Sequence, residues 1–133
     1  MFFCTKLKNI TIPKSCKEIL DGAFIPCSYL EEFFSESLYF YVHNKVLYNK
    51  DFKKLIVHPS NCFADVLPTI TDISNAKGFS GGSIFNFTFT ILIKSISSQV
   101  FRSCPNLDYV DISCTKVISI NNAVFLNPGK LKQ

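Results

Sequence analysis

The chain of 133 residues contains no tryptophan, one methionine and two histidines. None of its apolar runs approaches the ~18 residues that a membrane-spanning helix needs, so we expect no membrane insertion. Residues 1–4 include an apolar stretch, but Lys6 ends it well short of the roughly 7–15 apolar residues of a secretory signal. The sequence therefore indicates neither a membrane anchor nor a leader, and a cytoplasmic location stays open.

Several motifs that carry chemistry are also missing. There is no glycine-rich phosphate loop, no HExxH motif and no acidic calcium loop. The six cysteines include no CxxC pair, which disfavours zinc, and the net charge of +4 is not gathered into a dense basic stripe. We therefore expect no cofactor, no metal site and no nucleic-acid partner.

One pair of side chains is worth weighing for catalysis. Cys62 and His58 are the only nucleophile and base that lie near each other in the sequence, and a working pair also needs an orienting group. No recognised signature surrounds them, and a surface loop over residues 59–65 explains them better. We predict no catalytic residue and no enzyme.

Fourteen phenylalanines and a repeated spacing dominate what is present. One five-position pattern occurs three times: Ile19-x3-Ala23-Phe24-x2-Cys27-x2-Leu30, Ile96-x3-Val100-Phe101-x2-Cys104-x2-Leu107 and Ile120-x3-Val124-Phe125-x2-Pro128-x2-Leu131. Stepping back 23 positions from Ile96 reaches Ile73, which begins a worn fourth copy. Such a period predicts a repeat architecture, in which each unit buries its apolar face only against its neighbours.

The unit that contains Ile10, Ile12 and Pro13, followed by the Ala23-Phe24-x2-Cys27 segment, resembles the BspA-like, treponemal type of leucine-rich repeat. Residues 44–59 resemble the hairpin insertion that often interrupts such arrays, with strands at 46–49 and 54–58 around Lys50-Asp51. The resemblance implies a β-rich α/β leucine-rich-repeat fold, a right-handed solenoid of 23-residue units with one β-hairpin insertion and a short helical turn at 23–29. It also implies a surface antigen or adhesin.

We expect a single array over residues 1–133, either complete or part of a longer one. Its units cover about residues 7–30, 30–59 with the hairpin, 60–84, 84–107 and 107–131. The terminal units carry no polar cap, which predicts self-association or a continuing array. Cys27 and Cys104 occupy equivalent positions and are expected as small packing residues. A disulfide among Cys4, Cys16, Cys62 and Cys114 stays open for an exported protein.

In each strand the alternate residues point away from the core. These positions predict a polar sheet face with exposed aromatic residues, formed by Asn9, Thr11, Glu32, Phe34, Asn86, Thr88, Thr90, Tyr109, Asp111 and Ser113. Repeat proteins use such faces for binding, so we predict a binding module for a protein or glycan partner. The alternative is an intracellular scaffold for protein–protein interaction.

Overall fold

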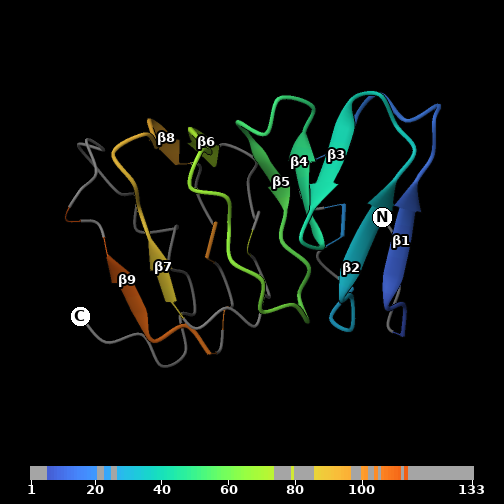
Figure 1. Ribbon diagram of the computed structural model, residues 1–133. Helices are drawn as coiled ribbons and strands as arrows, with labels where there is room; N and C mark the ends of the chain where they lie inside the picture. The colour runs from blue at the N-terminus through green and yellow to red at the C-terminus, as the bar shows by residue number, and fades with distance from the viewer. Residues whose placement is uncertain are drawn as a thin grey trace.

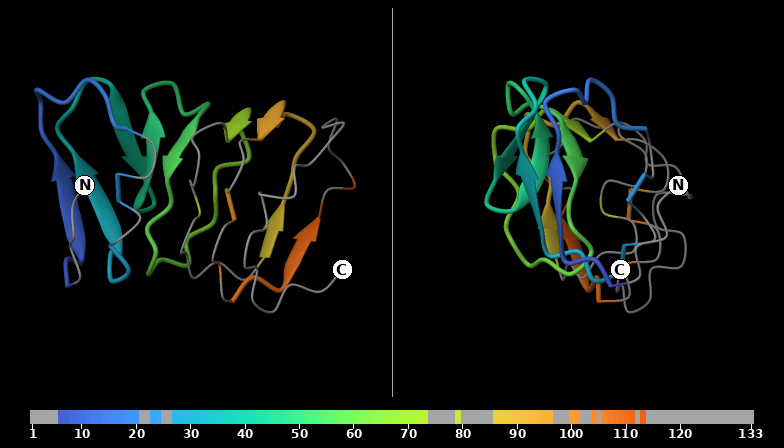
Figure 2. Two further views of the ribbon diagram at one scale, coloured as in Figure 1. Left: turned by 180° about the vertical axis from the view of Figure 1, so that it is seen from behind. Right: turned by 90° about the vertical axis from the view of Figure 1, so that its right-hand side faces the viewer.

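The structure is a computed structural model that describes residues 6–20, 23–24, 27–73, 79, 86–96, 100–101, 104, 106–111 and 113. The described residues form nine strands: β1 (Asn9–Ile12), β2 (Glu32–Ser35), β3 (Phe40–His43), β4 (Val46–Asn49), β5 (Leu55–Val57), β6 (Asp72–Ile73), β7 (Asn86–Thr88), β8 (Ser95–Ile96) and β9 (Tyr109–Asp111). Figure 1 and Figure 2 show the strands following one another along the molecule, from β1 at one end to β9 at the other. The chain is therefore extended along one direction.

Parallel pairing links strands of successive repeats. β1 pairs with β2, β6 with β8, and β7 with β9. The partners lie 23 positions apart in all three pairs, as in Asn9 with Glu32, Asp72 with Ser95, and Asn86 with Tyr109. This offset equals the period of the sequence pattern, so equivalent residues of neighbouring repeats lie side by side.

The hairpin insertion is larger than the sequence predicted. β4 and β5 pair antiparallel near the predicted positions, but β3 precedes them and pairs antiparallel with β4. His43 pairs with Val46, so Asn44 and Lys45 alone make the turn, with φ of 48° and 73°. Positive φ at both central residues is the geometry that a two-residue hairpin favours.

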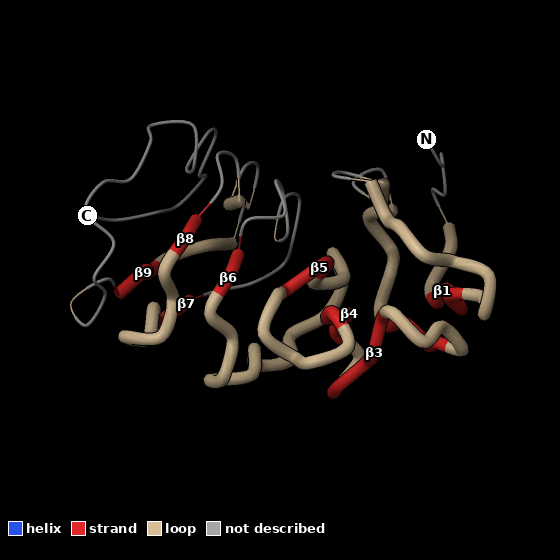
Figure 3. Tube along the Cα trace, turned by 90° about the horizontal axis from the view of Figure 1, so that it is seen from above, coloured by secondary structure: helices blue, strands red, loops and turns tan. Residues whose placement is uncertain are grey.

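The insertion also lies inside the molecule. Leu47 and Ile56 pack with Phe33 in a cluster near the N-terminal repeats, whereas Tyr48 and Leu55 pack in a second cluster that extends to Leu107. Figure 3 shows β3, β4 and β5 between β1 on one side and β6 and β8 on the other. Successive side chains of a strand point to opposite faces, so the hairpin divides the hydrophobic core in two.

The predicted helical turn is a series of single turns. The N–H groups of Ala23, Cys27 and Leu30 each donate to the carbonyl oxygen three residues earlier, at 3.1 Å. Within the described residues no helix forms. Phe24 packs edge-on against Phe33, with 5.2 Å between ring centroids, so the phenylalanine of the pattern does reach the core. The copy of the pattern at 120–131 lies outside the described residues.

The cysteines correct one expectation. Cys27 and Cys104 are both fully buried, as predicted, but Cys27 is disulfide-bonded and is not simply a packing residue. Burial among apolar side chains excludes water but does not prevent a bond to a second nearby cysteine. Cys16 and Cys62 are free thiols, and the thiol of Cys104 donates a hydrogen bond to the carbonyl oxygen of Phe79 at 3.0 Å, so the bond involves none of the three. Cys4 and Cys114 lie outside the described residues.

Over the same described ranges, the chain has no helix with the length and apolar character that a bilayer crossing requires.

Candidate functional site

The first part of the predicted face lies on β1 and β2. Their register places Asn9 beside Glu32 and Thr11 beside Phe34. Asn9 and Thr11 are exposed, Glu32 is half-buried, and Phe34 is 47% exposed. The alternation of the strands thus gives a polar ladder with an aromatic ring in it.

The second part lies on β7 and β9. Here Asn86 lies beside Tyr109 and Thr88 beside Asp111. Tyr109 is 57% exposed, which leaves most of its ring available to a partner. These two parts, with Thr90 and Ser113, are called the outer face below.

Thr90 and Ser113 follow β7 and β9 at the edge of the outer face. Thr90 is half-buried and Ser113 is exposed. Hydrogen bonds from the side chain and the backbone N–H of Ser113 lower the pKa of Asp111, and the N–H lies 2.8 Å from Asp111 Oδ1. This part of the face therefore carries a fixed negative charge at neutral pH.

The outer face is not one continuous ladder. β1 and β2 form one two-stranded sheet, and β7 and β9 form another. Residues 61–66 lie between them in the chain order of the repeats. The structure thus brings the ten predicted residues together as two groups, separated by one repeat position.

The sequence prediction missed two residues at that position. Phe63 is 62% exposed and Asp65 is also exposed. Ala64 and Val66, which alternate with them, pack against the core. This alternation matches the other repeats. Counting 23 positions back from Asn86 and Thr88 would have found Phe63 and Asp65, but the prediction treated residues 59–65 as a loop.

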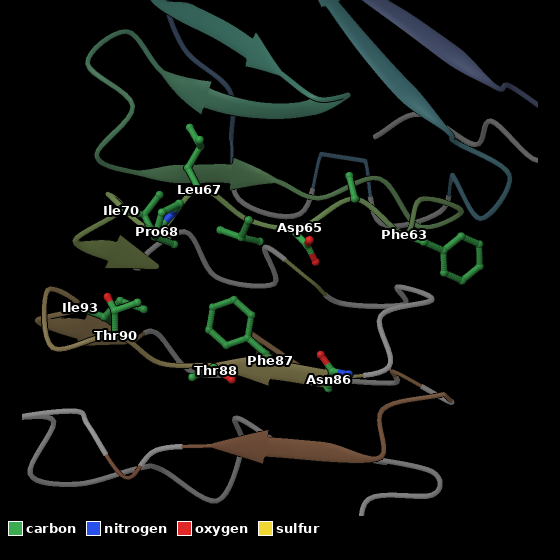
Figure 4. A pocket seen from close by; sticks show the side chains of 12 residues that line it. Phe63, Asp65, Leu67, Pro68, Ile70, Asn86, Phe87, Thr88, Thr90 and Ile93 are labelled. Carbon is green, nitrogen blue, oxygen red and sulfur yellow. The ribbon is translucent and has the colours of Figure 1, made fainter.

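A hollow of about 400 Å³ lies between residues 63–70 and β7. Its lining combines apolar and polar side chains from Phe63, Ala64, Asp65, Val66, Leu67, Pro68, Ile70, Asn86, Phe87, Thr88, Thr90 and Ile93. Figure 4 shows Phe87 projecting from β7 toward residues 63–70, and Asp65 projecting from that segment toward β7. We call this hollow the slot.

The small side chain of Ala64 accounts for part of the volume of the slot. Ala64 holds the repeat position that Ile10, Phe33, Phe87 and Val110 hold elsewhere. These four equivalents form two ladder pairs, Ile10 with Phe33 and Phe87 with Val110. A methyl group cannot fill the volume of a phenyl ring, so the position opens a space beside Phe87. Buried Phe87, Ile70 and Ile93 form an apolar floor, and Asp65, Asn86 and Thr88 form a polar rim.

His58 and Cys62 lie outside the strands, as expected for a loop, but they are buried and not on the surface. They are 3% and 4% exposed. His58 Nε2 lies 2.8 Å from the carbonyl oxygen of Ala64, and Nδ1 lies 3.2 Å from that of Pro59. Both ring nitrogens therefore face backbone carbonyls, which explains how an imidazole is accommodated in the core.

Burial lowers the pKa of His58, although the two carbonyl contacts and the charge of Asp65 oppose that shift. A neutral imidazole has one N–H and can donate to only one of the two carbonyls. The ring also packs on Phe79, with centroids 5.2 Å apart. The contacts indicate that His58 positions the segment that leads to Ala64.

Among the described residues, no three histidine, cysteine, aspartate or glutamate side chains gather in a group that could hold a metal ion. The outer face and the slot offer hydroxyl, amide, carboxylate and aromatic groups. Such groups suit recognition by hydrogen bonds and stacking.

The family model described as a BspA type leucine rich repeat region matches residues 1–66 and 65–133, with six copies. This confirms the family resemblance given by the repeat pattern. No sequence among curated proteins matches the chain.

Three solved structures are similar. A leucine-rich cell surface protein from Faecalibacterium prausnitzii has a TM-score of 0.71 and 25% identity, over 83% of this chain and 31% of its own. A leucine-rich repeat protein from Eubacterium ventriosum has 0.59 and 23%, over 82% and 37%. The pneumococcal vaccine antigen PcpA has 0.70 and 19%, over 80% and 27%. The chain thus spans about a third of the length of these proteins, and its fold is a leucine-rich repeat.

Proposed function

Since the chain belongs to the BspA-type leucine-rich repeat family, we propose that it is a non-catalytic binding module whose outer face contacts a protein or glycan partner. The observation that carries this proposal is the exposure of Phe34 and Tyr109 within ladders of polar residues. Exposed aromatic rings in a polar setting are favoured contacts in interfaces.

The proposal includes the finer architecture. We propose one right-handed solenoid over the whole chain, with the 23-residue units predicted from the sequence. The equal offset of 23 positions in the three parallel pairs supports this arrangement. A solenoid would keep equivalent outward residues in rows, and such rows form extended binding surfaces.

We place the chain at the cell surface, where it would act as an antigen or adhesin. One structural neighbour is a leucine-rich cell surface protein and another is a vaccine antigen. The disulfide of Cys27 adds support, because disulfides persist in oxidising environments outside the cytosol.

An intracellular scaffold is the second candidate, and the free thiols of Cys16 and Cys62 favour it. Protease treatment of intact source cells, with antibody detection of this protein and of a cytosolic control, separates the two settings. Cleavage with the control intact supports the cell surface. Protection of both proteins supports the scaffold.

The outer face is tested by replacing its aromatic residues. Wild-type protein is applied to an array of extracellular matrix proteins and glycans, and each hit is measured again with a Phe34→Ala, Tyr109→Ala double variant. We expect at least about tenfold weaker binding, as for the loss of hot-spot residues. Tyr29→Ala is the matched control, because Tyr29 is 55% exposed but lies outside the outer face. Equal binding by all three proteins would reject the outer face as the contact surface.

A further inference from the structure

The edge of β7 that faces the slot is open. The N–H of Phe89 donates to the carbonyl oxygen of Asp111, at 2.8 Å, so the backbone of Phe89 points toward β9. In a parallel ladder the backbone groups of alternate residues point to opposite sides. The N–H groups of Asn86 and Thr88 therefore face the slot, and in the described part of the chain β7 pairs with β9 alone.

The first two repeats show where these N–H groups would ordinarily bond. The carbonyl oxygen of Lys8 accepts from the N–H of Glu32 at 3.3 Å, and that of Ile12 accepts from Glu36 at 2.8 Å. Each donor lies 24 positions after its acceptor. The same relation would direct the N–H of Thr88 to the carbonyl oxygen of Ala64.

That carbonyl is directed elsewhere. Ala64 O lies 2.8 Å from His58 Nε2, and no hydrogen bond joins it to Thr88 among the described residues. His58 thus holds the wall of the slot away from a regular ladder, and Ala64 leaves space where other repeats carry a large side chain. An unpaired strand edge next to apolar surface is a template for another strand.

From this geometry we propose that the slot binds an extended peptide of a partner protein, which adds as a strand to the open edge of β7. This mode, in which backbone hydrogen bonds supply affinity, is known as β-augmentation. The proposal deepens the proposed function and rests on it, since it names a partner class for one part of the outer face. The volume of about 400 Å³ falls in the range of about 300–1,000 Å³ that is usual for ligand sites.

The residues that line the slot also determine which peptide sequences fit it. Small apolar side chains at alternate positions would enter the space beside Ala64 and Phe87, and the residues between them would point outward. Among the described residues that line the slot, Asp65 alone carries a charge, so a basic residue among the outward positions is favoured. The partner segment is thus a short strand that alternates small apolar residues with lysine or arginine.

The probe is the pentapeptide Lys-Val-Lys-Val-Lys, acetylated, amidated and labelled with fluorescein, and its binding to the wild-type protein is followed by anisotropy. Two N-methylated isomers of this peptide are compared with it. Each carries N-methyl groups on alternate backbone amides, and the two isomers differ in which edge of the peptide strand is methylated. Pairing along one edge predicts that one isomer loses about tenfold or more in affinity while the other binds nearly as well as the parent. Equal binding by both isomers, or no binding of the parent, overturns the proposal.

Variants of the protein test the same site. Ala64→Phe introduces the residue that two equivalent positions carry, Phe33 and Phe87, and should fill the slot, reducing peptide binding about tenfold or more. Ile10→Phe is its matched control, because it makes the same residue at the equivalent position of the first repeat and should leave binding unchanged. Asp65→Asn should reduce the preference for the lysine peptide over Thr-Val-Thr-Val-Thr, whereas Glu18→Gln should not. If a folded Ala64→Phe variant binds the pentapeptide as well as the wild type does, the slot is rejected as the binding site.

These outcomes are separable from those of the proposed function. If the Phe34 and Tyr109 double variant loses its array partner but the pentapeptide does not bind, the outer face stands and the slot is rejected. If the pentapeptide binds with the expected N-methyl pattern while the double variant keeps all array partners, the slot stands and binding by the outer-face aromatic residues is rejected. The N-methyl comparison uses wild-type protein, so it holds even where Ala64→Phe fails to fold.

Discussion

At the scale of single residues, Tyr48 shows how the core satisfies a polar group. Its side chain is fully buried, and its hydroxyl oxygen accepts a hydrogen bond from the N–H of Leu67 at 3.1 Å. Burial raises the pKa of Tyr48, so the hydroxyl stays neutral. The ring fills the core while the oxygen holds the segment that forms the far wall of the slot.

Replacing Tyr48 with phenylalanine would leave the N–H of Leu67 without its acceptor. We expect the free energy of unfolding to fall by about 1–3 kcal/mol, the usual cost of a buried unsatisfied donor. Urea denaturation followed by fluorescence or circular dichroism measures the change. Tyr41→Phe is the control, since Tyr41 is 40% exposed and should change stability by less than about 0.5 kcal/mol. Equal effects in the two variants would show that the Leu67 contact adds little.

His58 predicts a dependence of stability on pH. Its pKa in the folded protein is lowered from the ordinary value near 6.5, so the unfolded chain binds the proton more tightly. The stabilisation is therefore complete above the unfolded pKa and is lost as the pH falls through the folded pKa. The slope from this one residue is at most about 1.4 kcal/mol per pH unit.

Urea denaturation at several pH values between about 5 and 7.5 tests this prediction. We expect His58→Gln to flatten the dependence and His43→Gln, at an exposed site, to retain it. A His58→Gln protein with the wild-type pH profile would contradict the assignment. The burial of His58 could not be predicted from sequence, because its two carbonyl partners reach it only in the folded chain.

At the scale of elements, the β3–β4 turn combines a favoured geometry with an unfavoured residue. Lys45 has φ of 73°, in the left-handed region where a side chain is disfavoured by roughly 1–2 kcal/mol. Its carbonyl oxygen accepts from the N–H of Phe33 at 3.1 Å, so the turn also contacts β2. The turn therefore connects the insertion to the first sheet.

Lys45→Gly should raise the free energy of unfolding by about 1 kcal/mol, because asparagine followed by glycine is preferred in such two-residue turns. Thermal and urea unfolding measure the change. Lys50→Gly in the next turn is the control and should not stabilise, since Lys50 has no positive φ. Destabilisation by Lys45→Gly would mean that the lysine side chain contributes more than the backbone strain removes.

The sequence predicted β4 and β5 but not β3, and the reason is local. A hairpin turn is usually recognised by glycine, and this one uses Asn44 and Lys45 instead. The sequence also placed the insertion as an interruption of the array. Its burial on both faces depends on packing with Phe33 on one side and with Ile70 and Ile73 on the other, which no local pattern shows.

At the scale of the whole molecule, the repeat period predicted more than composition did. It predicted which residues of β1, β2, β7 and β9 are neighbours, since the three parallel strand pairs of the described residues join positions 23 apart. The same count leads from Asn86 and Thr88 back to Phe63 and Asp65, but treating residues 59–65 as a loop hid the slot beside them. Whether the outer face binds a partner stays a prediction.

The N-terminal repeat presents a second, mainly apolar hollow of about 390 Å³, lined by Leu7, Ile12 and Leu20 among others. Leu20 is 70% exposed. An uncapped repeat end predicts self-association or a continuing array, and self-association would cover this surface with a second copy of the chain. Light scattering should show the mass rising above 15.0 kDa with concentration, and Leu20→Glu should restore the monomer. A wild-type monomer at high concentration would contradict this.

Amide hydrogen exchange of the chain, measured with and without a partner from the matrix and glycan array, shows which strands that partner covers. If the outer face is the binding surface, exchange slows at residues 9–11, 32–34, 86–90 and 109–111, because the partner covers these strands. Slower exchange confined to residues 13–20 and 50–53, with no change in these strands, would contradict it.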